Sequence, residues 1–335
     1  MAAAALPASG IDNEHRRPRS SLHYRPTNLR LGSFAALVIS LSTITGASWA
    51  FFDVAGQERL GAEHYRETDV YADFGGAFHL TPSYRFYQSD YSNGGYNSWA
   101  LRMGYDKPKD GLGLTLGSTP KQHGYENEFA GLDAALSLGG AAASGVGSGG
   151  DKGGPQEKEA RRMGEDLGAG VTVTRHLEDF ELSGAQTDAL LPGLQSRPSP
   201  LTLVQTDLHG LAAVSWGWFW LGARVTKTLY DKNLSELAAA PAPLLEIEGA
   251  GAVANGFPDL SVNGKMKASF PDGIEPYISY THTSFVVEYP DSDAYTAGAF
   301  VYVGRLRVNG FYELYDPRLG IGTLGFYSLG VGWSF

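Results

Sequence analysis

Hydrophobic and polar residues alternate at every second position in many short segments of this chain. In residues 325–335, one face carries large, mainly apolar side chains from residue 327 onward: Tyr327, Leu329, Val331, Trp333 and Phe335. Successive side chains of a β-strand point to opposite faces, so this period predicts a strand with one apolar and one small, polar face. The chain therefore ends inside a strand that closes on an aromatic residue.

The same alternation recurs from residue 69 to the C-terminus. About fourteen segments fit it, separated by turn residues. They are 69–79, 80–91, 96–106, 111–119, 125–139, 165–177, 178–190, 200–215, 217–231, 260–270, 273–287, 293–304, 305–315 and 323–335. A soluble β-sandwich alternates too. Charge in mid-strand on the polar face, at Arg102, Lys265 and Arg307, favours an all-β transmembrane antiparallel β-barrel of about fourteen strands, with twelve as the alternative.

The first 50 residues have the composition of an export signal. Arg25 and Arg30 precede an uncharged stretch, and small residues at Ser48 and Ala50 predict cleavage after Ala50. A transmembrane anchor is the alternative, because the uncharged stretch is about long enough to span a bilayer. We assign 1–50 to an N-terminal extension with a signal peptide, 51–68 to a short periplasmic segment and 69–335 to the barrel.

The gaps between the predicted strands differ in length. Long gaps at 140–164, 191–199 and 232–259 follow the fifth, seventh and ninth segments, whereas a short turn at 271–273 follows the tenth. Outer-membrane barrels alternate longer extracellular loops with short periplasmic turns. The pattern predicts long surface loops near 140–164 and 232–259.

Composition narrows the chemistry. The 335 residues include no cysteine, which excludes disulfides, thiolate metal sites and a cysteine nucleophile. The net charge is −10, and removal of residues 1–50, which carry a net +3, lowers it to about −13, so nucleic acid is not an expected partner. The chain contains no phosphate-binding loop and no H-E-x-x-H sequence, so we expect neither a cofactor nor a metal.

The leader, the alternating segments and the final strand ending in Phe335 resemble Gram-negative outer-membrane β-barrel proteins. The resemblance implies a location in the bacterial outer membrane, in contact with lipid and lipopolysaccharide. It also implies that the apolar face of 325–335 is the signal read by the barrel assembly machinery. We further expect this strand to pair with the first strand and close the barrel. The residues indicate no particular subfamily.

The inward faces of the predicted strands carry charge of both signs. The candidate pore-lining residues are Arg102, Arg224, Lys265, Lys267, Glu275, Arg307 and Glu313. A barrel of twelve or more strands has room for water between such faces. Mixed charge in a narrow lumen predicts a porin-like channel for passive diffusion of small hydrophilic or ionic solutes. A plugged barrel whose inner charges pair with one another is the alternative.

A different activity is indicated by YISYTHTSFVVEYP at residues 277–290. His282 and Ser284 fall on the lipid-facing side, one pleat apart, and Asp293 follows as a candidate orienting group. Outer-membrane phospholipase A and lipid A deacylase have a similar His-x-Ser pair, followed by an Asn where this chain has Phe285. A lipid hydrolase is therefore an alternative function, and a structural or adhesive barrel acting through its loops is another. Whether the protein is an enzyme stays open at this point.

Overall fold

The structure is a computed structural model that describes residues 52–62, 64–88, 95–107, 110–122, 125–136, 167–178, 201–216, 218–232, 257–286, 290–318 and 322–335. All of them belong to one compact unit, Ser48–Phe335. Fourteen strands run through these ranges. They are β1 (Phe52–Gly61), β2 (Arg66–Gly75), β3 (Phe78–Gln88), β4 (Tyr96–Asp106), β5 (Asp110–Gln122), β6 (Tyr125–Leu136), β7 (Leu167–Glu178), β8 (Leu201–Trp216), β9 (Phe219–Tyr230), β10 (Pro258–Ala268), β11 (Ile274–Phe285), β12 (Ser292–Val303), β13 (Leu306–Asp316) and β14 (Leu324–Ser334).

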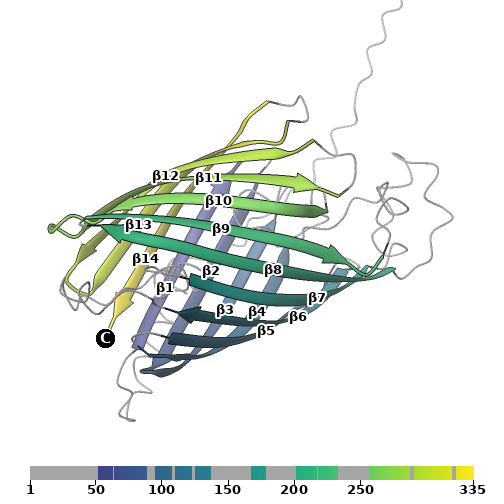
Figure 1. The fold of residues 1–335 in the computed structure, drawn as a ribbon, viewed down its shortest axis with the longest axis horizontal. Helices are drawn as coiled ribbons and strands as arrows, with labels where there is room; N and C mark the ends of the chain where they lie inside the picture. The colour runs from purple at the N-terminus through teal and green to yellow at the C-terminus, as the bar shows by residue number, and fades with distance from the viewer. Residues whose placement is uncertain are drawn as a thin grey trace, which may run out of the picture. The chain divides into compact units, whose positions relative to one another are not determined.

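The strands form one closed antiparallel barrel, in which each strand pairs with its neighbours in sequence and β14 pairs with β1 (Figure 1). The closing ladder runs from Asp53 opposite Ser334 to Gly61 opposite Phe326. Closure gives every strand two partners, so no row of backbone N–H and C=O groups is left at a sheet edge. The predicted fold class and the predicted closure by the last strand are confirmed.

The strand count agrees with the prediction, but the first strand does not come from the predicted segment. Residues 52–61, which we placed in a periplasmic segment, form β1 and are part of the barrel wall. The alternation is weak there because Glu58 faces outward, where it makes an ion pair with Arg66 at 2.9 Å. The assignment of 51–68 to the periplasm is therefore wrong for β1.

Two further boundaries differ. The predicted strands 69–79 and 80–91 are shifted, because the chain turns at residues 76 and 77, after Gly75, whose φ of 127° lies in a region that L side chains rarely adopt. The predicted strand 178–190 lies outside the described residues apart from its first position. The fourteen strands of the described residues include β1, which was not predicted, and none from 179–190, so the strand count still agrees with the prediction.

The added strand also changes where the long connections begin. Asp53 lies opposite Ser334, so both ends of the barrel-forming chain are at one end of the barrel. The connection from β6 to β7, residues 137–166, leaves from this same end, whereas 179–200 and 231–257 leave from the other end. The two predicted surface loops, 140–164 and 232–259, therefore start from opposite ends of the barrel. Most of their residues lie outside the described ranges.

Candidate functional site

The outer face of the barrel is apolar. Outward positions with large exposed apolar side chains include Leu101, Leu112, Leu132, Leu208, Leu221, Val262, Ile278, Val301 and Val331. Soluble proteins rarely expose a continuous apolar surface of this extent, whereas a hydrocarbon environment requires it. The exterior is thus matched to the acyl chains of a bilayer.

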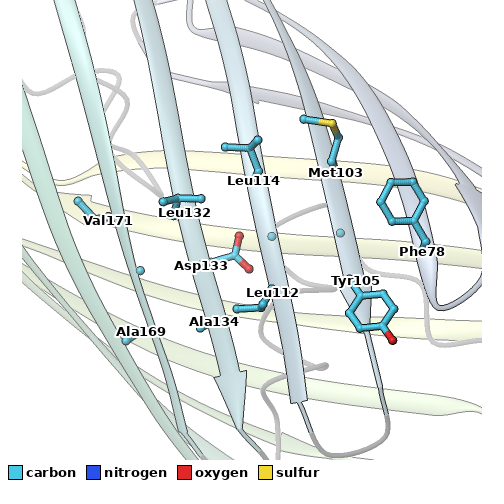
Figure 2. Close-up of a pocket in the computed structure, with 13 residues that line it drawn as sticks. Phe78, Met103, Tyr105, Leu112, Leu114, Leu132, Asp133, Ala134, Ala169 and Val171 are labelled. Carbon is cyan, nitrogen blue, oxygen red and sulfur yellow. The ribbon is translucent and has the colours of Figure 1, made fainter.

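A shallow depression of about 570 Å³ lies in this outer wall, across β3 to β7 (Figure 2). Apolar side chains such as Phe78, Leu112, Leu132 and Val171 line most of it, and the one charged residue among the lining residues, Asp133, has its carboxylate on the inner face. A surface of this kind accommodates lipid chains and presents little to a polar solute. The polar and charged side chains of the wall lie instead on the inner face and at the rims.

All seven predicted pore-lining residues face inward. Their strand registers place them on the side opposite the exposed apolar residues, and inward side chains are buried or half-buried. Arg102 lies on β4, Arg224 on β9, Lys265 and Lys267 on β10, Glu275 on β11, and Arg307 and Glu313 on β13. They are spread around the wall rather than gathered at one point, so they form a lining and not a single binding site.

Around Arg102 the inner face holds a compact ionic cluster. Arg102 pairs with Asp133 of β6, and its guanidinium lies 3.4 Å from His79 Nε2 of β3. His79 Nδ1 lies 3.5 Å from Asp106. These side chains lie along the wall because glycines leave room for them: a Cβ at Gly113 would be 2.3 Å from Arg102 Nη2. The cluster is therefore folded against the strands.

Lys265 and Lys267 are also held by neighbours on the inner face. Lys265 Nζ lies 4.1 Å from the centre of the Tyr277 ring, a cation–π contact. Lys267 Nζ lies 3.4 Å from Glu275, which also accepts hydrogen bonds from Ser269 and Tyr302. Two of the predicted residues of opposite sign thus form a pair on adjacent strands.

An inner charge network joins β1, β2, β3 and β13, and it is not apparent from the sequence if β1 is placed outside the barrel. Arg59 of β1 contacts Glu313 of β13 at 2.5 Å and Glu67 of β2 at 3.9 Å. Arg85 of β3 contacts Glu67 at 3.3 Å and Asp69 at 2.7 Å. The sequence signal for this network is the position of Arg59, Glu67 and Asp69 on alternate residues within GQERLGAEHYRETD, if this segment is interpreted as two barrel strands.

Next to this network, in the β1–β2 connection, Tyr65 donates a hydrogen bond to Glu67 and is 3% exposed. Burial, assisted by the Glu67 carboxylate, raises the pKa of Tyr65, so its hydroxyl stays a donor at neutral pH.

Inner side chains of β13 also reach past β14 to the first strands. Arg307 donates to the Tyr71 hydroxyl of β2 at 2.9 Å, and Asn309 donates to Gln57 of β1 at 3.3 Å. They pass over β14 where it has Gly330 and Gly332: a Cβ at Gly330 would be 2.1 Å from Asn309 Oδ1. The glycines on the inward face of β14 thus leave room for hydrogen bonds from β13 to β1 and β2, across the junction that closes the barrel.

On the outer face, the predicted His282, Ser284 and Asp293 lie near the end of the barrel opposite the chain termini. His282 of β11 pairs in register with Asp293 of β12, and its Nδ1 is 2.9 Å from Asp293 Oδ1. Asp293 also accepts hydrogen bonds from Tyr280 at 2.7 Å and from the Arg318 guanidinium, whose Nε is at 2.9 Å. Ser284 Oγ donates to the Leu260 carbonyl at 3.4 Å instead of contacting the imidazole.

A closed barrel with an apolar exterior and a polar, charged interior is matched to a bilayer around it. The protein is a transmembrane β-barrel of the outer-membrane type. That architecture places it in the bacterial outer membrane. In the described ranges, we find no helix that is both long and apolar enough to cross a membrane. Nor do these ranges hold a group of three or more metal-ligating side chains.

Comparison with known proteins gives likenesses of fold only. No protein-family model and no curated protein matches the chain. Among solved structures, CdiB from Acinetobacter baumannii aligns with a TM-score of 0.46 and 8% identity, over 84% of this chain and 60% of CdiB. Omp33 from A. baumannii aligns with a TM-score of 0.42 and 9% identity, over 85% and 98% of the two chains. OpdK from Pseudomonas aeruginosa aligns with a TM-score of 0.38 and 10% identity, over 85% and 98%.

The residues expected to form the assembly signal of this outer-membrane barrel all lie on the outer face of β14. Tyr327, Leu329, Val331, Trp333 and Phe335 are 43–62% exposed. Phe335 contacts Phe52, with ring centres 5.0 Å apart, so the terminal aromatic packs beside the first strand. Recognition of this face by the assembly machinery stays a prediction.

Proposed function

We propose that this outer-membrane barrel is a porin-like channel for passive diffusion of small hydrophilic or ionic solutes. The observation that carries the proposal is that inner charged side chains lie flat against the wall, over inward glycines. Arg102 lies over Gly113 and His79 over Gly104, where added Cβ atoms would be 2.3 and 2.0 Å away. Side chains held in this way occupy little of the space inside the barrel.

The size of the barrel supports the same function. Eight-stranded barrels are filled by their own side chains, whereas those of sixteen to eighteen strands leave an aqueous channel. Fourteen strands have a wider interior than eight, and its walls carry both Arg and Lys cations and Asp and Glu carboxylates. Such a lining favours small polar or charged solutes over apolar ones.

Two alternatives use the same fold. The paired inner charges are also consistent with a plugged barrel that conducts nothing, and a barrel acting through its connections would bind ligands without conducting. Both are distinguished from a channel by electrical recording. The purified protein in a planar bilayer is expected to give discrete conductance steps, and a trace indistinguishable from that of protein-free bilayers would rule the channel out.

A matched pair of substitutions on β4 tests whether current passes through the lumen. Ala100 faces inward between Ser83 and Gly117, whereas Leu101 faces outward and is 39% exposed. Ala100→Trp is expected to reduce the conductance step, because its indole projects into the interior. Leu101→Trp is expected to leave it unchanged. Equal effects of the two substitutions would place the current outside the barrel lumen.

A further inference from the structure

The outward-facing cluster at the rim of β11 and β12 is not used by a channel. It consists of Tyr280, His282, Ser284, Asp291, Asp293 and Arg318. Polar and charged groups on the lipid-facing side of a barrel wall are costly unless they lie near an interface. His282, Ser284 and Asp293 lie near the end of β11 and the start of β12, at the end of the barrel away from the termini. Asp291 and Arg318 lie in the connections that follow β11 and β13. In an outer-membrane barrel, a polar rim of this kind is expected at the level of the lipid head groups and acyl esters.

The central group of the cluster is the Asp293 carboxylate. Its side chain is 6% exposed, and it accepts hydrogen bonds from His282 Nδ1, the Tyr280 hydroxyl and the Arg318 guanidinium. Arg318 is itself held in place, because its backbone N–H donates to Asp316 Oδ1 at 2.8 Å and its φ of 51° is one that residues other than glycine seldom adopt. Several independent contacts therefore fix the carboxylate that orients the imidazole.

The imidazole is oriented as a general base requires. Because Nδ1 donates to Asp293, Nε2 is the nitrogen free to accept a proton. Nε2 lies 3.5 Å from Asp291 Oδ2, and the His282 side chain is 34% exposed. Ser284 lies on the same face two residues along the strand, and its hydroxyl makes only a 3.4 Å hydrogen bond. That hydrogen bond is long, so it holds the Ser284 hydroxyl only weakly.

We propose that Asp293, His282 and Ser284 form an acyl-ester hydrolase site on the outer wall of the barrel, acting on an ester-linked fatty acid of a membrane lipid. In the reaction Ser284 Oγ attacks the ester carbonyl while its proton passes to His282 Nε2. The carbon–oxygen bond to the lipid alcohol breaks, and the alcohol takes the proton from Nε2. Water, activated by the same imidazole, then releases the fatty acid from the serine.

The roles differ among the six residues. Ser284 and His282 are the catalytic residues because they touch the reacting atoms, whereas Asp293, Tyr280 and Arg318 are positioning residues. Asp291 Oδ2 lies 3.5 Å from Nε2, the nitrogen that must accept the serine proton. Replacement of Asp291 by Asn removes the charge of that carboxylate, so D291N is expected to keep the activity or increase it.

The experiment measures fatty-acid release by the full-length purified barrel in vesicles of phosphatidylethanolamine and, in a second arm, of lipopolysaccharide. Release in the first arm alone assigns a glycerophospholipid, and release in the second alone assigns an ester of the lipopolysaccharide anchor. Ser284→Ala is expected to reduce release to the vesicle background, and Asp293→Asn to lower it by at least about tenfold. The control Ser279→Ala removes an inward-facing hydroxyl of the same strand and is expected to have no effect.

A second readout separates chemistry from folding. A fluorophosphonate ester is expected to label the wild-type protein and D291N at Ser284, with loss of fluoride, but not S284A. Each variant is first checked for a folded barrel by its shifted mobility on unheated gels. Release by folded S284A equal to that of the wild type, or no release by the wild type in either arm, overturns the proposal. Neither result depends on the conductance of the lumen, so the hydrolase proposal and the channel proposal are tested independently.

Discussion

At the scale of single residues, the wall depends on where glycines lie. Inward Gly298 has no room for a side chain: an added Cβ would be 2.6 Å from the Gly310 backbone oxygen and 2.7 Å from Phe311 Cβ. Gly264, on β10, has no atom within 4 Å of the same position. Two glycines in similar strands thus differ entirely in what they do for packing.

Gly298→Ala is expected to destabilise the barrel by about 1–3 kcal/mol, because the new methyl group meets backbone that cannot move alone. Gly264→Ala is expected to be neutral or to stabilise by up to about 1 kcal/mol, since it only restricts the unfolded chain. Urea unfolding in lipid vesicles compares the two. A larger loss for Gly264→Ala would contradict this description of the wall.

At the scale of elements, several side-chain contacts on the inner face reinforce the junction between β1 and β14. Besides the backbone ladder, side chains of β13 reach β1 and β2 across the small inner face of β14. The Arg59–Glu313 pair is the most buried of them, with side-chain exposures of 7% and 5%. Removing only one partner of such a pair is destabilising, because the other charge stays buried without its partner.

Arg59→Met alone is expected to lower the free energy of unfolding by about 3–5 kcal/mol, since Glu313 stays buried and charged. The double variant Arg59→Met/Glu313→Leu is expected to regain most of that loss, as apolar side chains of similar size replace the pair. Thermal or urea unfolding of the two single variants and the double variant gives the coupling energy. Additive losses would show that the pair does not act as a unit.

The element that most needs a direct test is β1 itself. Deleting residues 52–61 removes the partner of both β2 and β14 and leaves two open sheet edges. We expect the deletion to abolish the folded form on unheated gels, whereas replacing 233–256 by a short flexible linker between β9 and β10 is expected to preserve it. If the protein still folds into a barrel without 52–61, that segment is not a strand of the barrel wall and the periplasmic assignment is correct.

At the scale of the whole molecule, the two faces of the wall separate two proposed activities. The inner face carries the paired charges of the proposed channel, and the outer rim carries the Asp293–His282 contact. The sequence has no cysteine, so any introduced cysteine is the only thiol in the chain. Water access can therefore be measured one position at a time.

A water-soluble maleimide is expected to label Ala100→Cys, which faces inward, and not Leu101→Cys, which faces the bilayer. In intact vesicles the rate at Ala100→Cys is expected to fall as the reagent becomes bulkier, because the reagent must enter the lumen. Labelling is followed by mass change or gel shift. No labelling of the inward position by even the smallest reagent would indicate a plugged barrel.

Particular residues show how far the sequence predicted the molecule. The period of two in β4, β12 and β14 assigned the two faces correctly, because it depends only on strand geometry. β1 was missed because an outward Glu58–Arg66 pair interrupts the apolar face, and an ion pair between neighbouring strands is not visible in one strand alone. Because one strand was missing from the count, the prediction also placed the 137–166 connection at the wrong end of the barrel.

The sequence by itself determined that the chain forms strands with one apolar and one polar face, and that these must close into a barrel. The reason is local: alternation is a property of consecutive residues, and hydrocarbon tolerates no open edge. Only the tertiary structure decided which inner charges pair, that β13 reaches β1 across the glycines of β14, and that Asp293 contacts His282. Those contacts join residues from different strands, and strand register, not composition, brings them within reach.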